Sequence, residues 1–163
     1  MRMLVAIAAA FYPLCALAWC ESYPTVAEEF SQSATVAVGK VVAEEKVNTS
    51  GDYFDGTNYR VTVSEILQGE KMKNITLFSE NSSGRFPMTV GENYLVFASV
   101  EHGLLPGHPV LAINNCGNSG LLSEVQPKLK EVRLLTKKRP AHHSSGTAQK
   151  RAASVAWATV SWR

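Results

Sequence analysis

The chain has 163 residues, of which 45% are hydrophobic and 18% charged, and its formal net charge is +2. The charge is unevenly distributed: residues 19–136 hold nine Lys/Arg and all 14 Asp/Glu, whereas residues 137–163 hold six Lys/Arg and no acid. The acidic body argues against nucleic acid as a partner, because phosphate binding needs a basic surface. The length predicts one domain with a substantial core.

The first 18 residues have the three parts of a secretory signal peptide. Arg2 gives a short basic region, residues 4–14 are apolar, and cleavage is expected after Ala18. The apolar stretch is interrupted by Pro13 and is too short to cross a bilayer core of about 30 Å. The sequence therefore predicts an exported protein without a transmembrane segment, secreted or extracellular, or periplasmic or on the cell surface in a bacterium.

Cleavage would remove Cys15 and leave Cys20 and Cys116 in the mature chain. Two cysteines in an oxidising compartment predict one disulfide, and the alternative is two unpaired buried thiols. A lipid anchor on Cys20 is a competing interpretation, because the preceding residues loosely resemble a bacterial lipobox. Trp19 argues against this anchor, since it stands where the lipoprotein peptidase needs a small residue.

The first folded elements are a short helix and a strand. Thr25 and Glu28 have the T-x-x-E spacing of a capping box, which predicts a helix over residues 26–32. Residues 35–43 are β-branched and mostly apolar, which predicts a strand. Gly39 is expected to form a bulge or bend within it.

Four further strands are predicted. The turn-rich residues 48–58 indicate a hairpin connection to a strand at 59–67, whose side chains alternate between a buried and a wet face. Another strand is predicted over residues 74–78. Residues 94–98 form the most apolar segment and are expected to be the most central strand. A short last strand is predicted over residues 110–113.

A second helix is predicted to begin near Ser123, with Pro127 in its first turn, where a missing N–H does no harm. Apolar residues recur there at helical spacing, at Val125, Leu129, Val132 and Leu135. The basic tail, residues 137–163, shows no convincing period and is expected to be disordered. It is a candidate for weak contact with an anionic surface, and the alternative is a solvated tail without a partner.

Short strands separated by turns and flanked by two helices predict an all-β fold built around a barrel of about five strands. The order and pattern of residues 33–41, 59–69 and 90–98, framed by Cys20 and Cys116, resemble the netrin-like domain family. This family includes the N-terminal domain of the tissue inhibitors of metalloproteinases. The resemblance implies an OB-like five-stranded barrel with flanking helices.

The resemblance covers about residues 20–136 and implies a non-enzymatic, exported module that binds another protein. Its most concrete form is inhibition of a metalloprotease. In the inhibitors the mature chain begins with Cys, whose α-amino and carbonyl groups chelate the catalytic zinc of the target. Cys20 is the matching residue here. Cleavage after Ala18 leaves Trp19 ahead of it, and the nitrogen of Cys20 is then an amide that cannot chelate. The inhibitors also begin Cys-x-Cys, whereas position 22 is Ser.

The expected organisation is a signal peptide (1–18), a netrin-like OB-fold domain (19–136) and the basic tail (137–163). The alternative function is a general extracellular adaptor or ligand-binding barrel without inhibitory activity. The expected partner is an extracellular or periplasmic protein, with a zinc metalloprotease as the specific candidate. Three Asn-x-Ser/Thr sequons are potential glycosylation sites if the source is eukaryotic, at Asn48, Asn74 and Asn81.

No catalytic residue, metal ligand or cofactor is predicted. His102 and His108 lie in a Gly/Pro-rich loop without supporting carboxylates or cysteines, and His142 and His143 are equally isolated from other metal ligands. The sequence contains no Gly-x-Ser-x-Gly to form a nucleophile elbow. The face predicted for the strand at 59–67 also lacks the aromatic platform that single-stranded nucleic acid requires.

Overall fold

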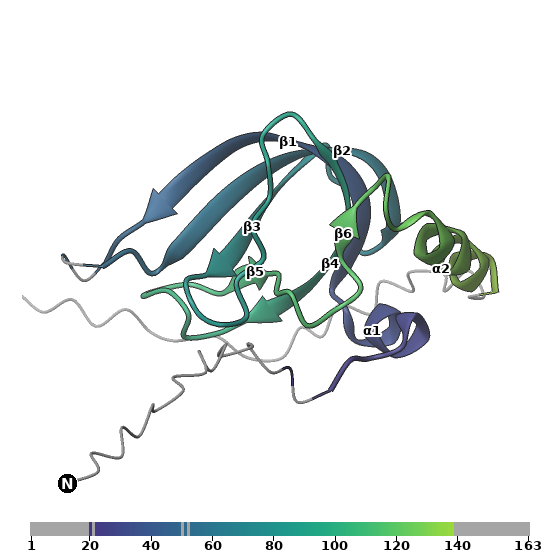
Figure 1. The fold of residues 1–163 in the computed structure, drawn as a ribbon, viewed down its shortest axis with the longest axis horizontal. Helices are drawn as coiled ribbons and strands as arrows, with labels where there is room; N and C mark the ends of the chain where they lie inside the picture. The colour runs from purple at the N-terminus through teal and green to yellow at the C-terminus, as the bar shows by residue number, and fades with distance from the viewer. Residues whose placement is uncertain (1–19, 21, 50, 52, 139–163) are drawn as a thin grey trace, which may run out of the picture.

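The computed structural model describes residues 20, 22–49, 51 and 53–138 (Figure 1). The predicted signal peptide, Trp19 and the tail beyond Lys138 lie outside these residues. The elements in chain order are α1 (Val26–Gln32), β1 (Thr35–Val47), β2 (Gly56–Gln68), β3 (Asn74–Glu80), β4 (Asn93–Glu101), β5 (Val110–Ala112), β6 (Gly120–Leu121) and α2 (Gln126–Lys138).

Five strands close into a ring. β1, β2 and β3 are successive antiparallel neighbours, β5 pairs in parallel with β3 and antiparallel with β4, and β4 pairs back onto β1. The two-residue strand β6 is added to the other end of β4. The ring and its two helices confirm the predicted all-β class with flanking helices. Because the closing pair joins Thr35 to Ala98, the ring depends on contacts between segments far apart in the sequence.

β1 bends so that it can pair with both β2 and β4. Its register with β2 shifts between Val38 and Gly39, which confirms the irregularity expected at this glycine. A Cβ atom on Gly39 would lie 2.5 Å from Cγ1 of Val61 and 2.8 Å from the carbonyl oxygen of Thr62. The two strands therefore approach so closely here that no larger side chain fits without a shift of the backbone.

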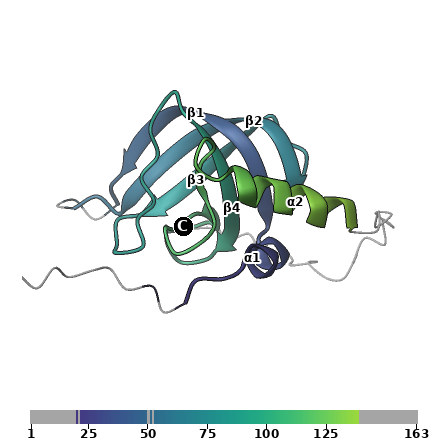
Figure 2. The same cartoon turned by 45° about the vertical axis from the view of Figure 1, so that its right-hand side comes forward.

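The core has two parts, one inside the ring and one between the ring and the helices. β4 contributes to both, because Tyr94, Val96 and Ala98 point into the ring while Leu95 and Phe97 point toward the helices. This explains why β4 is apolar on both faces, as expected for the most central strand. Figure 2 shows α1 and α2 together against one side of the ring. The helices cover the ring with Val26, Phe30, Leu129 and Val132.

α1 forms where the sequence predicts it, and α2 begins at Gln126, three residues after the predicted start near Ser123. The side chain of Thr25 accepts a hydrogen bond from the backbone of Glu28, whose carboxylate accepts one from the Thr25 backbone, and this completes the capping box. Pro127 lies in the first turn of α2. This helix runs through Lys138, so the first two residues assigned to the basic tail belong to it.

β3 and β4 run beyond their predicted ends, to Glu80 and Glu101, and two further differences change the topology more. β1 and β2 continue as a paired hairpin to Val47 and Gly56, so the connection is shorter than the predicted 48–58. The added pairs carry polar side chains, which hid the strand period. β5 is also not the last strand, because β6 follows it. β6 lies in a turn-rich segment and forms only because Leu95 and Tyr94 provide partners.

A candidate binding site at the N-terminal strap

The segment that precedes α1 is tied across one end of the ring by a disulfide. We call residues 20 and 22–25 the N-terminal strap. Cys20 is bonded to Cys116, with the two Cα atoms 5.6 Å apart and 96 positions apart in sequence. Cys116 belongs to the loop between β5 and β6, residues 113–119. The disulfide predicted from the cysteine count is therefore confirmed.

Asn118 provides a second tie between the same loop and the strap. Its Nδ2 donates hydrogen bonds to the carbonyl oxygen of Pro24, at 3.0 Å, and to Oε2 of Glu29, at 2.7 Å. Its backbone nitrogen also donates to Oε2 of Glu29, at 2.5 Å. Asn118 is buried, so these bonds satisfy polar groups that water does not reach. The strap is thus held at Cys20 and again at Pro24.

Gly117 allows the carboxylate of Glu29 to reach Asn118. A Cβ atom at position 117 would lie 2.1 Å from Oε1 of Glu29, closer than any side chain tolerates. The carboxylate therefore occupies the space that another residue would fill at this point. The loop sequence Cys116-Gly117-Asn118 combines a covalent tie, an open space and a hydrogen-bond donor.

Partial burial raises the pKa of the Glu29 carboxyl above its ordinary value of 4.5. The two hydrogen bonds from Asn118 and the positive charge of Lys128 lower it, but desolvation is the largest effect. The folded protein therefore holds the proton of Glu29 more tightly than the unfolded chain does.

The Glu29→Gln variant is expected to show a weaker loss of stability with rising pH than the wild type. Stabilisation by the protonated carboxyl is complete below the unfolded pKa and is lost as the pH rises through the higher folded pKa. Gln keeps an acceptor oxygen for Asn118 but does not ionise. The measurement is the difference in free energy of unfolding between the two proteins, by urea titration from about pH 4 to 7. Parallel pH profiles would show that Glu29 is not responsible.

Tyr23 projects from the strap between its two ties. Its side chain is 72% exposed, while Cys20 and Pro24 on either side are partly buried. Tyrosine combines a large apolar surface with a hydroxyl and is enriched in protein interfaces. A fixed backbone on both sides also means that little conformational freedom of the strap is lost when a partner binds. Tyr23 is therefore an exposed aromatic residue between the two points at which the strap is held.

Two neighbouring cavities are lined in part by the β5–β6 loop. One, of about 330 Å³, is bounded by Glu80 and Glu101. The other, of about 240 Å³, is bounded by the strap residues Ser22 and Pro24. Both cavities are lined by Ser99, Ala112, Asn114 and Cys116. The strap and the β5–β6 loop thus line the second cavity together, through Ser22, Pro24 and Cys116.

The structure brings together only part of the predicted site. Cys20 and Cys116 meet as predicted, whereas Trp19 lies outside the described residues. Sequence reasoning missed the contact of Glu29 with Asn118, which are 89 positions apart. The acid within α1 and the Asn of the turn-rich loop gave no signal that they would pair.

The histidines and the other side chains capable of metal binding do not lie together among the described residues. His102 and His108 are exposed and line a third cavity of about 570 Å³, whose other lining residues include no carboxylate or thiol. Among the described residues, no group of three or more His, Cys, Asp or Glu side chains is placed to hold a metal ion. Neither described helix has the length and apolar character needed to span a bilayer.

Comparison with protein-family models and with curated proteins gives no match.

Proposed function

We propose that this chain is an exported, non-enzymatic protein-binding module with an OB-like barrel, and that the N-terminal strap contacts the partner. The observation that carries the proposal is the double fixation of the strap, by the Cys20–Cys116 disulfide and by the bond from Asn118 to Pro24. These ties leave Tyr23 exposed on the strap, whose neighbours Ser22 and Pro24 line a cavity of about 240 Å³. A segment held in this way loses little conformational freedom when it binds another protein.

The most concrete form of the proposal is inhibition of a zinc metalloprotease, as the resemblance to the netrin-like family implies. Zinc in such an enzyme keeps an open coordination position, which a free amine and a neighbouring carbonyl oxygen can occupy. Cys20 offers these groups only if it is the first residue of the mature chain. If Trp19 precedes it, the strap can still fill a protease cleft, but the inhibitor does not coordinate the metal.

N-terminal sequencing of the exported protein distinguishes these two modes. Cys20 as the first residue is the outcome required for chelation, and Trp19 as the first residue excludes it. Inhibition of a panel of purified zinc metalloproteases by the same preparation then tests whether a protease is the partner. Absence of inhibition across the panel would favour the alternative, an extracellular adaptor that uses the same strap.

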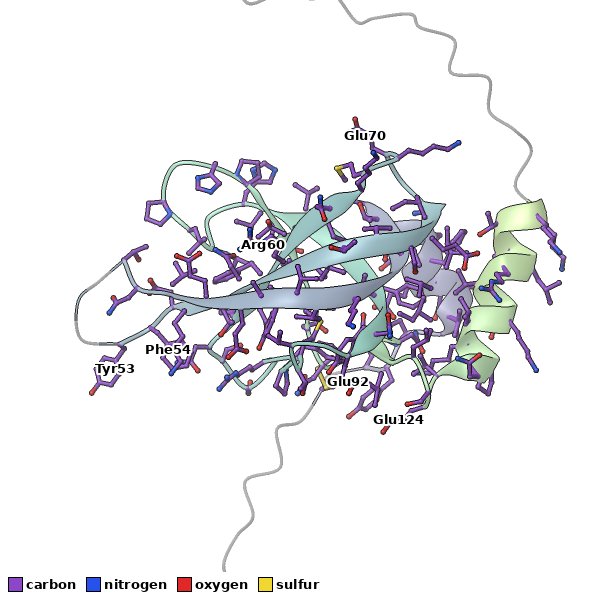
Figure 3. The ribbon with its side chains drawn as sticks, turned by 90° about the horizontal axis from the view of Figure 1, so that it is seen from above. Tyr53, Phe54, Arg60, Glu70, Glu92 and Glu124 are labelled. Carbon is purple, nitrogen blue, oxygen red and sulfur yellow. A yellow bond between two sulfur atoms is a disulfide. The ribbon has the colours of Figure 1, made fainter. Side chains whose placement is uncertain are left out.

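Tyr23→Ala is expected to weaken partner binding or inhibition about thirtyfold, which corresponds to about 2 kcal/mol for a central aromatic contact. Tyr53→Ala is the matched control, because Tyr53 is 81% exposed at the tip of the β1–β2 hairpin, away from the strap (Figure 3). It should change the dissociation constant less than about threefold. The measurement is the inhibition constant, or the equilibrium dissociation constant for a partner that is not a protease. Equal losses for the two variants would contradict a role for the strap.

A further inference from the structure

The outer face of α2 carries a cluster of lysines around one exposed leucine. Lys130, Leu134, Lys137 and Lys138 follow one another at i, i+4, i+7 and i+8, so they share one side of the helix. All four are exposed, and 57% of Leu134 is accessible to solvent. We call these four residues the outer face of α2. Glu131, the one acidic residue in this helix, is also exposed and lies three positions before Leu134, so it borders the same side.

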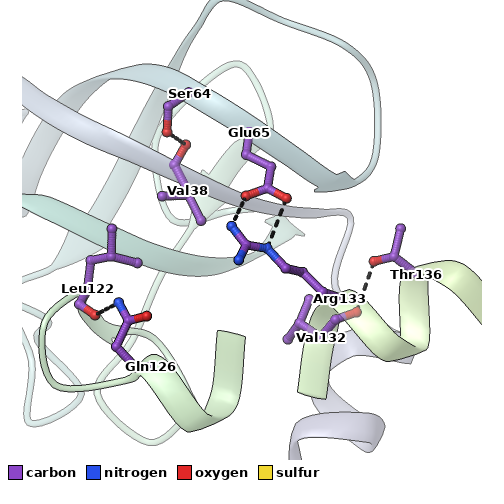
Figure 4. Close-up of polar contacts among 8 residues, drawn as sticks. All are labelled: Val38, Ser64, Glu65, Leu122, Gln126, Val132, Arg133 and Thr136. Carbon is purple, nitrogen blue, oxygen red and sulfur yellow. Dashed lines mark hydrogen bonds and ion pairs between the residues drawn. The ribbon is translucent and has the colours of Figure 1, made fainter. Parts of the chain in front are cut away.

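The orientation of α2 is fixed by contacts on its other side. Leu129 and Val132 are buried in the core between the ring and the helices. Arg133 forms an ion pair with Glu65 at 2.6 Å, and Oγ1 of Thr136 donates a hydrogen bond to the carbonyl oxygen of Leu67 at 3.1 Å (Figure 4 shows the ion pair). These contacts neutralise Arg133 and prevent the helix from rolling. The outer face therefore remains turned to solvent, and its three lysines outnumber the one bordering acid, Glu131.

The sequence that follows α2 continues the same composition. Residues 139–163 contain four more Lys/Arg and no Asp or Glu, together with Trp157 and Trp162. Lysine and arginine favour anionic surfaces, while leucine and tryptophan favour the boundary between lipid headgroups and acyl chains. A soluble polyanion would attract the charges but would offer no apolar phase to Leu134 or the tryptophans. The combination points to a bilayer.

We propose that the outer face of α2 binds the surface of an anionic lipid bilayer, with its lysines among the headgroups and Leu134 at the acyl boundary. Long lysine side chains can reach the headgroups while the helix lies parallel to the surface. The tip of the β1–β2 hairpin, at the opposite end of the molecule from α2, would then point away from the bilayer (Figures 1 and 3). This inference does not depend on the proposed partner of the strap.

The test is cosedimentation of the full exported chain with vesicles of phosphatidylcholine containing a quarter phosphatidylglycerol, at physiological salt. Each lysine near such a surface strengthens binding about fivefold, so Lys130→Gln/Lys137→Gln should weaken it roughly twentyfold. Lys40→Gln/Lys46→Gln removes the same charge from exposed positions of β1 and should weaken it less than about threefold. An intact disulfide and an unchanged circular dichroism spectrum establish that each variant is folded.

Leu134→Ser separates a bilayer from a soluble polyanion. It is expected to weaken binding to the vesicles about threefold or more and to leave binding to heparin unchanged, because only the bilayer offers an apolar phase. Equal loss for the α2 and β1 lysine pairs would overturn the proposal. The proposal would also be overturned if Lys130→Gln/Lys137→Gln bound vesicles as tightly as the wild type does. Two other results would do the same: a wild type that binds heparin but not vesicles, and a Leu134→Ser variant whose vesicle binding is unchanged.

Discussion

The double variant Cys20→Ser/Cys116→Ser is expected to have a free energy of unfolding about 4 to 5 kcal/mol below that of the wild type. The disulfide joins residues 96 positions apart and so closes the chain from α1 through β5 into one loop. In the chain-entropy account, a long loop removes much of the conformational freedom of the unfolded state. The same change frees the strap at Cys20 and leaves the bond from Asn118 to Pro24 as its remaining tie.

Urea titration of the oxidised wild type, the reduced wild type and the double variant measures this effect. The reduced wild type is the control, because it loses the bond without losing either side chain. It should match the variant. A difference of less than about 1 kcal/mol between the oxidised protein and the variant would mean that the disulfide contributes little to the stability of this domain.

Gly39→Ala is expected to lower the free energy of unfolding by about 2 to 3 kcal/mol. The added methyl group would meet the side chain of Val61 and, at 2.8 Å, the backbone oxygen of Thr62. Since the backbone of β2 cannot move aside without breaking its pairing, β1 must shift. β1 also pairs with β4 through Gly39 and Tyr94, so the shift strains the closure of the ring.

Gly84→Ala is the matched control for Gly39→Ala. Its added Cβ would lie 3.6 Å from the nearest neighbouring atom, which is an ordinary contact. The expected change in the free energy of unfolding is within about 0.5 kcal/mol. Urea titration of both variants measures the two free energies of unfolding. Equal stability of the two alanine variants would show that the ring tolerates extra volume at Gly39, against the account given for its closure.

Local patterns in the sequence predict most of the helices and strands, but they do not predict which strands pair to close the ring. Thr25 and Glu28 specify the start of α1 because the capping box is formed by residues three positions apart. The bend at Gly39 is likewise evident from the residue itself. Pairing of Thr35 with Ala98 and of Leu95 with Gly120 cannot be inferred in this way, because these contacts arise only when the ring forms.

In the candidate site, too, one contact can be predicted from the sequence and another cannot. The bond between Cys20 and Cys116 follows from chemistry and compartment, because the mature chain is expected to hold only these two cysteines. The hydrogen bonds of Asn118 to Pro24 and Glu29 cannot be predicted from the sequence. Glu29 resembles any acid in the first turn of a helix, and Asn118 resembles any residue of a turn. Their contact through the space left by Gly117 depends on the fold that brings α1 against the β5–β6 loop.

We propose that the strap is the surface through which this module contacts its partner, and site-specific crosslinking tests this proposal most directly. Benzoylphenylalanine is placed at position 23 in one preparation of the exported protein and at position 53 in another, since both native tyrosines are exposed. Irradiation with the partner that binds the wild type should give an adduct from position 23 and none from position 53. An adduct from position 53 alone would contradict the claim and place the contact on the β1–β2 hairpin.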